Sequence, residues 1–322
     1  MGHNILITSA GRRVSLVRIF RKELQKKFPG SKIIAVDSNP ELSAACKVAD
    51  VSLRVPPADH KEYVEALLEF CSFHDVGMMI PTIDTELQTL SDNKMKLLEK
   101  GITCVVSEPG FISVCRNKIK VIDFFIEKNI STLKQYNKHA LTYPVIVKPV
   151  SGSASKNIFI AQEKIDIPEK VFAGEDFIYL PYLDPKKFSE YTVDLYYSKD
   201  YKLKCVVPRK RLEVREGEVS KAITIKNKIC PYLFEKIEYL EGVQGVINLQ
   251  LFYNEKEGQL FASEINPRFG GGYPLSFHSG ANFPAMLIEE YYFSKTITYT
   301  ENWKENIMML RYDDEIIFEN ND

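Results

Sequence analysis

The first third of the chain alternates short apolar runs with amphipathic segments. Within residues 14–28, Val17, Phe20 and Leu24 recur at helical spacing, as on the buried face of a helix. The same pattern predicts strands over residues 4–8, 32–36, 76–80 and 102–106, and helices over residues 14–28, 63–73 and 86–98. Strands and helices that alternate in this way form a parallel sheet covered by helices. The sequence therefore predicts an α/β fold that begins with a doubly wound parallel sheet.

Polar loops follow three of these predicted strands. In a doubly wound sheet, ligands bind at the carboxyl ends of the strands, so the three loops should meet at one rim. The candidate substrate-binding residues of this rim are Ser9, Gly11, Arg12, Asp37, Asp84 and Glu86. A structural alternative remains for two of them, because Asp37 can cap a turn and Glu86 can cap a helix. The first loop lacks a full GxGxxG pattern, so a dinucleotide is not predicted.

The pattern changes after Pro109. A helix is predicted over residues 117–129, and a polar stretch then leads to an apolar β-branched run that ends at Lys148. From there the segments read as strands joined in hairpins rather than as a parallel alternation. We therefore expect an α+β region to follow the N-terminal sheet.

Bulk composition excludes several classes of protein. The 322 residues include 42 Lys and Arg against 43 Asp and Glu, so no overall field favours nucleic acid or an anionic membrane. The six cysteines are scattered without CxxC spacing, which predicts neither a zinc site nor a disulfide framework. The sequence shows neither an N-terminal apolar leader nor a membrane-length apolar run. We expect a cytoplasmic protein.

The stretch from Glu264 to Arg268 places a carboxylate, an amide and a guanidinium at alternating positions. In a strand, Glu264, Asn266 and Arg268 would share one face. Residues 245–252 form another predicted strand, and a turn-rich linker joins the two, so Gln250 should lie across the hairpin from this row. Such oxygen ligands suit Mg²⁺, and arginine suits phosphate. Gly271 and Gly272, which follow, are candidate substrate-binding residues, because glycine lets a ligand approach the backbone closely. The alternative is a polar strand edge that runs into a glycine-rich turn.

Lys148 is followed by a loop of small residues. The ammonium group at the end of an apolar strand should be held at the mouth of a pocket. Backbone N–H groups and hydroxyls of the loop, which spans residues 151–156, can surround phosphate oxygens without steric cost. The alternatives are a lysine that reaches out to water and an exposed hairpin loop.

Taken together, these motifs resemble the ATP-grasp superfamily. Lys118 at a helix start, Lys148, the 151–156 loop, Gln250 and the row from Glu264 to Arg268 follow one another in the superfamily's order. The Asn-x-Gln and Glu-x-Asn-Pro-Arg motifs are most similar to the synthetase halves of the carbamoyl-phosphate synthase large chain and to ligases of pyrrolysine biosynthesis. The resemblance implies a pre-ATP-grasp domain over residues 1–112, a small ATP-grasp lobe over 113–183 and a large lobe over 184–322.

The resemblance also implies roles for individual residues. Lys118 and Lys148 would contact the α and β phosphates of ATP, and Gln250, Glu264 and Asn266 would ligate Mg²⁺ or alternatively Mn²⁺. Arg268 would steady the transferred phosphate. The loop that would close over the β and γ phosphates contributes Ser151, Gly152, Ser153, Ser155 and Lys156.

Adenine would be read by the connection between the lobes. The carbonyl of Pro181 and the N–H of Leu183, on either side of Tyr182, are the candidate groups. The superfamily usually carries a glutamate in this connection and this chain does not, so ribose binding would move to Asp184 or Glu190.

A run of basic residues supplies a further candidate. Alternation places Arg209 and Arg211 on the face opposite Lys210, which we assign to a solvated face between two strands. The resemblance implies that Arg211 contacts the γ phosphate or the acyl phosphate.

The predicted function is an ATP-dependent carboxylate–amine ligase that forms an acyl phosphate on an amino acid or a similar small carboxylate. Its partners would be that carboxylate and an amine, with no nucleic acid or membrane, and a homo-oligomer is left open. One alternative is phosphorylation of bicarbonate or carbamate, as in carbamoyl-phosphate synthase. Another is a nucleotide-binding partner protein without turnover, because Gln250 leaves only one evident negative ligand for the metal.

Overall fold

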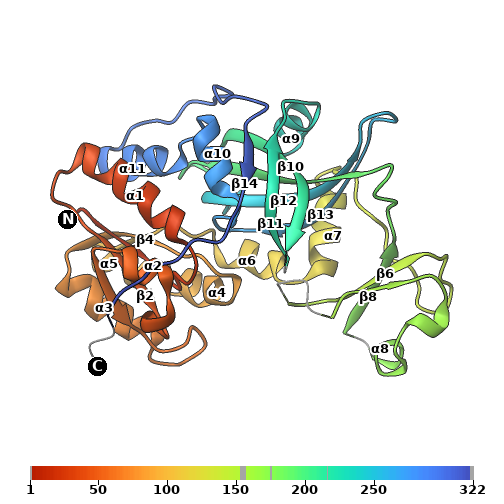
Figure 1. The fold of residues 1–322 in the computed structure, drawn as a ribbon, viewed down its shortest axis with the longest axis horizontal. Coiled ribbons are helices and arrows are strands. Elements are labelled where there is room, and N and C mark those ends of the chain that lie inside the picture. The colour runs from red at the N-terminus through yellow and green to blue at the C-terminus, as the bar shows by residue number, and fades with distance from the viewer. Residues whose placement is uncertain (1, 153–156, 175, 216, 320–322) are drawn as a thin grey trace.

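The computed structural model describes residues 2–152, 157–174, 176–215 and 217–319. The predicted phosphate-loop residues Ser153, Ser155 and Lys156 lie outside the described residues. Three sheets follow one another along the chain, and Figure 1 shows the small sheet set apart from the other two.

The N-terminal sheet is parallel, as predicted. Its strand order is β3-β2-β1-β4-β5. The strands are β1 (Asn4–Ile7), β2 (Ile33–Asp37), β3 (Val51–Arg54), β4 (Val76–Ile80) and β5 (Thr103–Cys104), and the helices are α1 (Val14–Lys27), α2 (Ala44–Val48), α3 (Tyr63–Phe73), α4 (Asp84–Asp92) and α5 (Lys94–Glu99). The order reverses between β1 and β4, so the loops after these strands meet at a switch point.

Two predictions for this region were incomplete. Residues 86–98 do not form one helix, because the helix is interrupted at Asn93. The side-chain amide of Asn93 donates to the carbonyl of Thr89 at 2.9 Å. The edge strand β3 and the short helix α2 were not predicted. Both are too short to give a clear hydrophobic period, and β3 alternates half-buried and exposed residues because it lies at the edge of the sheet.

A small antiparallel sheet comes next, with the order β7-β6-β8. Its strands are β6 (Val145–Pro149), β7 (Phe159–Ala161) and β8 (Phe177–Pro181), and the helices around it in the chain are α6 (Pro109–Cys115), α7 (Lys118–Glu127) and α8 (Glu169–Ala173). Val145 and Val147 pack into one apolar cluster on one face of β6. Alternation therefore turns Ile146 and Lys148 to the other face, toward the rest of the protein.

The large sheet has the order β13-β12-β9-β10-β11-β14. Its strands are β9 (Ser189–Tyr197), β10 (Leu203–Arg215), β11 (Glu218–Thr224), β12 (Gly245–Asn254), β13 (Gln259–Asn266) and β14 (Met308–Leu310), and its helices are α9 (Ile229–Ile237), α10 (Tyr273–Ser279) and α11 (Phe283–Phe293). Figure 1 shows α10 and α11 lying beside α1 between this sheet and the N-terminal sheet. One continuous apolar core joins the two regions, from Ile5 on β1 to Leu249 on β12.

Among the described residues, no helix has both the length and the apolar character needed to cross a bilayer. The longest helix, α1, has 14 residues, whereas a crossing needs about 20.

The basic run at Arg209 does not connect two strands, as predicted, but lies within the single long strand β10. Arg209 faces the interior and is 0% exposed. Its Nε and Nη2 atoms donate to the two carboxylate oxygens of Asp194 on β9, at 2.7 and 2.9 Å, and the Ser276 hydroxyl donates to the same carboxylate. A buried charge is tolerated only with such a partner. The Asp194 carboxylate therefore joins Arg209 on β10 to Ser276 on α10.

We expect Asp194→Ala to destabilise the fold strongly, because it leaves the buried Arg209 guanidinium without its counter-charge. The loss should be about 3–5 kcal/mol of unfolding free energy. Urea unfolding followed by circular dichroism measures it. The control is Glu213→Ala, which removes a partly exposed carboxylate paired with Lys221 on the same sheet and should cost much less. Equal losses in the two variants would show that Asp194 has no special role.

Candidate functional site

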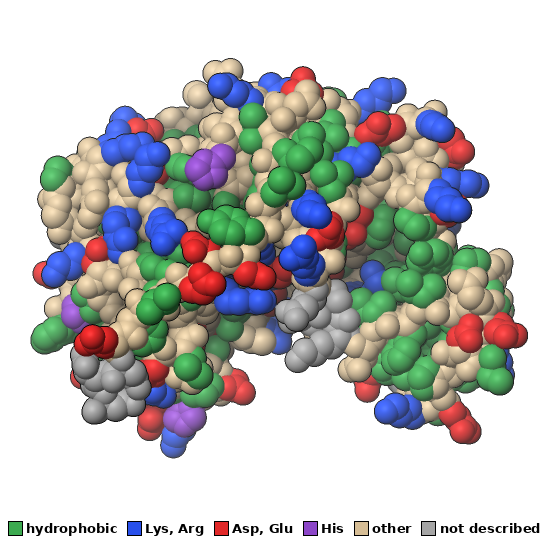
Figure 2. All heavy atoms as spheres, in the orientation of Figure 1, with side chains coloured by type: hydrophobic (Ala, Val, Ile, Leu, Met, Phe, Trp, Pro, Cys, Tyr) green, Lys and Arg blue, Asp and Glu red, His purple; other side chains and the backbone are tan. Residues whose placement is uncertain are grey.

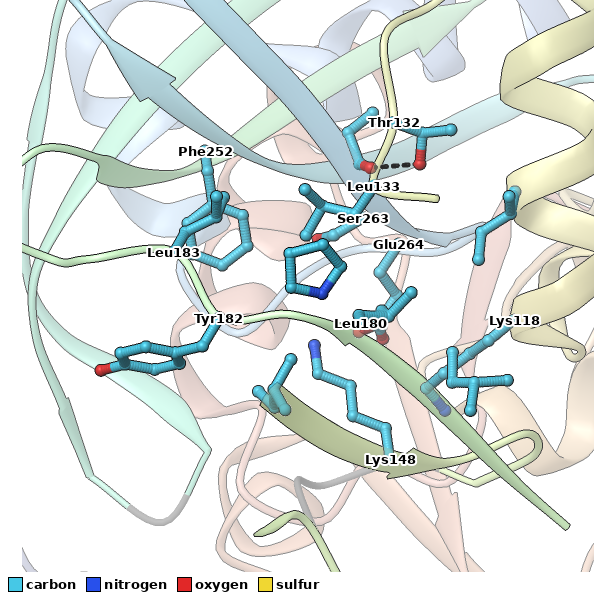
Figure 3. Close-up of a pocket in the computed structure, with 15 residues that line it drawn as sticks. Lys118, Thr132, Leu133, Lys148, Leu180, Tyr182, Leu183, Phe252, Ser263 and Glu264 are labelled. Carbon is cyan, nitrogen blue, oxygen red and sulfur yellow. Dashed lines mark hydrogen bonds between the residues drawn. The ribbon is translucent and has the colours of Figure 1, made fainter. Parts of the chain in front are cut away.

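A mostly apolar pocket lies between the small sheet and the large sheet. Figure 3 shows the side chains that line it. Ile146 and Lys148 enter from β6, Ile178 and Leu180 from β8, and Phe252 from β12. The remaining lining residues are Lys118, Ile122, Thr132, Leu133, Pro181, Tyr182, Leu183, Ala262, Ser263 and Glu264. Such a flat apolar slot with a few polar groups at one end suits an aromatic ring that carries a charged substituent.

Two lysines reach the polar end of this pocket. Lys118 opens α7, whose first turn is capped by the Asn117 side chain, and its Nζ lies 3.3 Å from the carbonyl oxygen of Gly152. In Figure 3 the Lys148 side chain rises from β6 toward the middle of the pocket. Within the described residues, neither ammonium group forms an ion pair with a carboxylate. The site therefore holds positive charge that is available to a ligand.

Burial lowers the pKa of both lysines. For each of them loss of hydration is the main cause, and the nearby carboxylate of Glu264 opposes it. Lys148 also lowers the pKa of Lys118, because two like charges lie close together. An anion between the two lysines would offset both the loss of hydration and the repulsion between their ammonium groups.

The connection after β8 presents backbone groups to the pocket. The N–H of Tyr182 donates to the carbonyl of Pro144 at 3.2 Å. Among the described residues no hydrogen bond satisfies the Leu183 N–H. The Tyr182 side chain points away from the pocket in Figure 3. This geometry is consistent with the prediction that backbone atoms, rather than the tyrosine ring, read a ligand edge here.

The predicted row of polar side chains is present at the end of β13. Gln250 lies directly opposite Glu264 in the β12–β13 register, and Asn248 lies opposite Asn266. The amide of Asn266 donates to Glu264 Oε1 at 3.1 Å, and Arg268 Nη2 lies 3.3 Å from Asn266 Oδ1. The same Arg268 atom donates to Asp84 at 2.6 Å. One chain of hydrogen bonds thus links the large sheet to the N-terminal rim.

The donor set fits a hard divalent cation, although it is weakly charged. Gln250, Glu264 and Asn266 offer oxygen atoms, but only Glu264 carries a negative charge. Across the described residues, no group of three or more His, Cys, Asp or Glu side chains is arranged to hold a metal ion. A cation at this row would therefore depend on ligand oxygens, such as those of a phosphate, for most of its negative charge.

A second cavity continues from the first. It shares Lys118, Ser263 and Glu264 with the apolar pocket and extends to Asp84 and Arg116 at the N-terminal rim. Its other lining residues are Thr85, Leu87, Ile112, Cys115, Val121, Gly152, Ile265, Asn266 and Pro267. In Figure 2 the surface is hollowed between the small lobe and the rest of the molecule, where both cavities open. The two cavities thus form one path, which runs from the apolar slot past Lys148 and Lys118 to an end lined by Asp84 and Arg116.

Several predicted rim residues have structural roles instead. The side chain of Glu86 is fully buried and accepts hydrogen bonds from Ser9, Tyr63 and the Thr82 and Ile83 backbone. Asp37 accepts from the N–H groups of Gly11 and Asn39, so it shapes the first loop and its own turn. These are the capping alternatives that the sequence left open. Arg12 is exposed, and Asp84 alone of the predicted rim residues lines the second cavity.

The predicted glycines are required by close packing. A Cβ atom at Gly272 would lie 2.2 Å from Nη1 of the buried Arg209, and one at Gly271 would lie 2.6 Å from Nη1 of Arg13. Close packing therefore accounts for these glycines without a ligand, and their contact with a substrate stays a prediction. They leave room for two arginine side chains.

The two ribose candidates are already engaged. Glu190 pairs with Arg211 at 2.6 Å, and Asp184 accepts from the Lys186 N–H at 2.9 Å in a turn. The Arg211 side chain is 8% exposed, and its Nε atom has no partner among the described residues. A contact between Arg211 and phosphate stays a prediction.

Sequence reasoning missed the apolar lining of the slot. Thr132, Leu133 and Phe252 contribute to it, and the Thr132 hydroxyl donates to the Ala262 carbonyl at 2.8 Å, a bond drawn in Figure 3. Single apolar residues carry no sequence signal that separates a ligand pocket from a core. The sequence analysis also did not select Arg13 as a candidate residue, although it is the neighbour of Arg12, which it did select.

Two family profiles match separate parts of the chain. A family profile described as the PylC-like N-terminal domain matches residues 5–105, and one described as ATP-grasp in the biosynthetic pathway with Ter operon matches residues 174–312. No curated protein sequence matches the chain significantly.

Solved structures with the same fold include three from bacteria. The biotin carboxylase domain of Hydrogenobacter thermophilus 2-oxoglutarate carboxylase, solved with MgADP and bicarbonate, has a TM-score of 0.71 at 16% identity, covering 95% of this chain and 73% of that one. L-amino acid ligase from Bacillus licheniformis has a TM-score of 0.67 at 15% identity, covering 89% and 73%. N5-carboxyaminoimidazole synthetase from Staphylococcus aureus, solved with ADP, has a TM-score of 0.67 at 16% identity, covering 88% and 76%. At such identities the likeness establishes the fold.

The lowered pKa values of Lys118 and Lys148 predict unusual reactivity toward amine reagents. Only the neutral amine reacts, so a lowered pKa moves the rise in labelling to lower pH than for a free lysine side chain. The rate of labelling by trinitrobenzenesulfonate, measured by mass spectrometry between pH 7 and 11, gives the midpoint for each lysine. Midpoints at or above that of a model lysine peptide would contradict the burial of these two groups.

Proposed function

Because the chain joins a PylC-like N-terminal domain to an ATP-grasp domain, we propose that it is an ATP-dependent carboxylate–amine ligase. It would activate a small carboxylate as an acyl phosphate and then join it to an amine. The observation that carries the proposal is the continuous path of the two cavities, which share Lys118 and Glu264. A nucleotide and a carboxylate can lie end to end along this path.

We infer a position for each part of the nucleotide along this path. The adenine ring would fill the apolar slot, with its edge at the backbone of residues 181–183, and the phosphates would lie between Lys118 and Lys148. Those two lysines supply the charge that the phosphates need, and binding would offset the cost of burying the ammonium groups. Mg²⁺ held by Gln250, Glu264 and Asn266 would neutralise charge on the transferred phosphoryl group. The complexes with ADP named for the related folds support this placement.

The chemistry needs no side-chain nucleophile. A carboxylate oxygen of the substrate attacks the γ phosphorus in line, the bond to the β–γ bridging oxygen breaks, and ADP leaves. A neutral amine then attacks the acyl carbon, phosphate departs with the former carboxylate oxygen, and the amine loses one proton. Arg268 donates to Asp84, which lines the second cavity, so its guanidinium would lie near the negative charge that accumulates in both steps.

Hydroxylamine trapping tests the ligase. With ATP, Mg²⁺ and hydroxylamine, a panel of amino acids and small carboxylates should include at least one that yields a hydroxamate and an equal amount of ADP. Glu264→Ala should lower this rate by roughly two orders of magnitude or more, because it removes the charged metal ligand. If no member of the panel gives a hydroxamate, the ligase proposal fails. ADP release that needs only bicarbonate would indicate the carbamoyl-phosphate-synthase-like alternative, and tight ATP binding without turnover would indicate the non-catalytic one.

Gln250→Glu should strengthen the metal site, because it adds a second carboxylate opposite Glu264. We expect the Mg²⁺ concentration for half-maximal ADP release to fall by about tenfold, which corresponds to about 1.4 kcal/mol. Titration of Mg²⁺ at fixed ATP measures it. Gln259→Glu is the matched control, since Gln259 is exposed at the start of β13, the other strand of this hairpin, and its substitution should leave the midpoint unchanged. An unchanged midpoint in Gln250→Glu would place the metal elsewhere.

A further inference from the structure

Three arginines from distant parts of the chain meet beside the acceptor end of the path. Arg13 precedes α1, Arg268 follows β13, and Arg311 follows β14. Figure 1 shows the segment after β14 running from the edge of the large sheet toward the N-terminal sheet, where the ammonium of Lys47 lies 4.2 Å from the ring centroid of Phe318. We call Arg13, Arg268 and Arg311 the arginine cluster.

The arginine cluster is held by two carboxylates. Glu218 on β11 lies between Arg13, at 3.7 Å, and Arg311, at 2.8 Å. Arg311 also donates to the carbonyl of Gly271 at 2.5 Å, and Arg268 pairs with Asp84 at 2.6 Å. The side chains of Arg13 and Arg268 are 17% and 15% exposed, so the charges lie in a largely desolvated corner.

The positive charges outnumber the negative ones. Burial lowers the pKa of Arg13, and the neighbouring guanidinium groups of Arg268 and Arg311 lower it further, against the effect of Glu218 and Asp84. Burial by itself would raise the pKa of Glu218, but the surrounding arginines outweigh it and lower the value. Both pKa shifts have one cause in common, which is the close spacing of several guanidinium groups. Repulsion between buried like charges costs free energy unless a further anion binds beside them.

No other side chain of the described residues supplies that anion. The acidic residues that follow Arg311, at positions 313–315, are exposed and form no ion pair with the arginine cluster within the described part of the chain. The Nε atom of Arg268 is buried without a hydrogen-bond partner among the same residues. In the part of the chain that the structure describes, the arginine cluster therefore lacks both a hydrogen-bond acceptor for Arg268 Nε and a carboxylate to balance its third positive charge.

We propose that the arginine cluster binds a second anionic group of the substrate, a carboxylate or a phosphate, beyond the carboxylate that is activated at Arg268. The position of the reacting carboxylate rests on the proposed function. Arg13 and Arg311 both contact Glu218, and Arg268 contacts Asp84 at the end of the second cavity, so the arginine cluster can hold an anion one short linker away from the reacting group. Planar guanidinium groups recognise either oxyanion with paired hydrogen bonds. The acid substrate is thus dianionic, such as an acidic amino acid or a phosphorylated amino acid.

Binding of matched pairs of amino acids tests this inference without requiring turnover. The pairs are L-glutamate and L-glutamine, L-aspartate and L-asparagine, and O-phospho-L-serine and L-serine, titrated calorimetrically into the full chain with MgADP. In at least one pair the anionic member should bind about tenfold tighter or more. The pairs with a second carboxylate and the pair with a phosphate distinguish the two oxyanions.

Variants of the arginine cluster identify its role. Arg13→Gln and Arg311→Gln should each reduce the preference to within about twofold, because each removes one cation from the corner. Arg18→Gln is the matched control, since Arg18 is exposed on α1 and its loss should leave the preference intact. Circular dichroism melts show whether each variant is folded.

The outcomes separate this inference from the ligase proposal. Equal binding within every pair, or no binding by any of the six compounds, overturns the arginine cluster as an anion site, even if monocarboxylates give hydroxamates. A preference that survives both Arg13→Gln and Arg311→Gln overturns it as well. Preferential binding of an anionic member that depends on Arg311 supports it, even if no hydroxamate is formed and the ligase proposal fails.

Discussion

The hydrogen-bond chain from Glu264 through Asn266 and Arg268 to Asp84 is the interaction on which the site depends. It begins on β13 in the large sheet and ends at the first turn of α4 in the N-terminal region. A ligand carboxylate at Arg268 would compete with Asp84 for the same guanidinium. Occupancy of the site and contact between the two regions are therefore coupled through one side chain.

The sequence was sufficient for the features that rest on periodicity and pairing. The parallel N-terminal sheet followed from the alternation of strands and helices, and the position of Gln250 opposite Glu264 followed from the length of the turn between two strands. The superfamily resemblance rested on a few side chains in the right order. A family profile described as ATP-grasp in the biosynthetic pathway with Ter operon matches residues 174–312, in agreement with that resemblance.

What the sequence could not supply depends on contacts between distant segments. Nothing near Arg209 indicates that its partner is Asp194, because the pairing needs the register of β9 against β10. Arg311 is likewise an ordinary residue until β14 joins the edge of the sheet and brings it to Glu218. The sequence predicted Glu86 as a substrate-binding residue, although it caps α4. A polar residue after a strand gives the same sequence pattern whether it faces a cavity or caps the next helix.

Gly272 has a consequence for anyone who maps this protein by saturation mutagenesis. A side chain there would collide with the guanidinium of Arg209, which lies in the interior of the sheet and touches no cavity described above. An activity screen would score Gly272 as intolerant, in the same way as a position that contacts a ligand. Only a parallel screen for abundance of folded protein would reveal that the glycine protects the sheet, not the reaction.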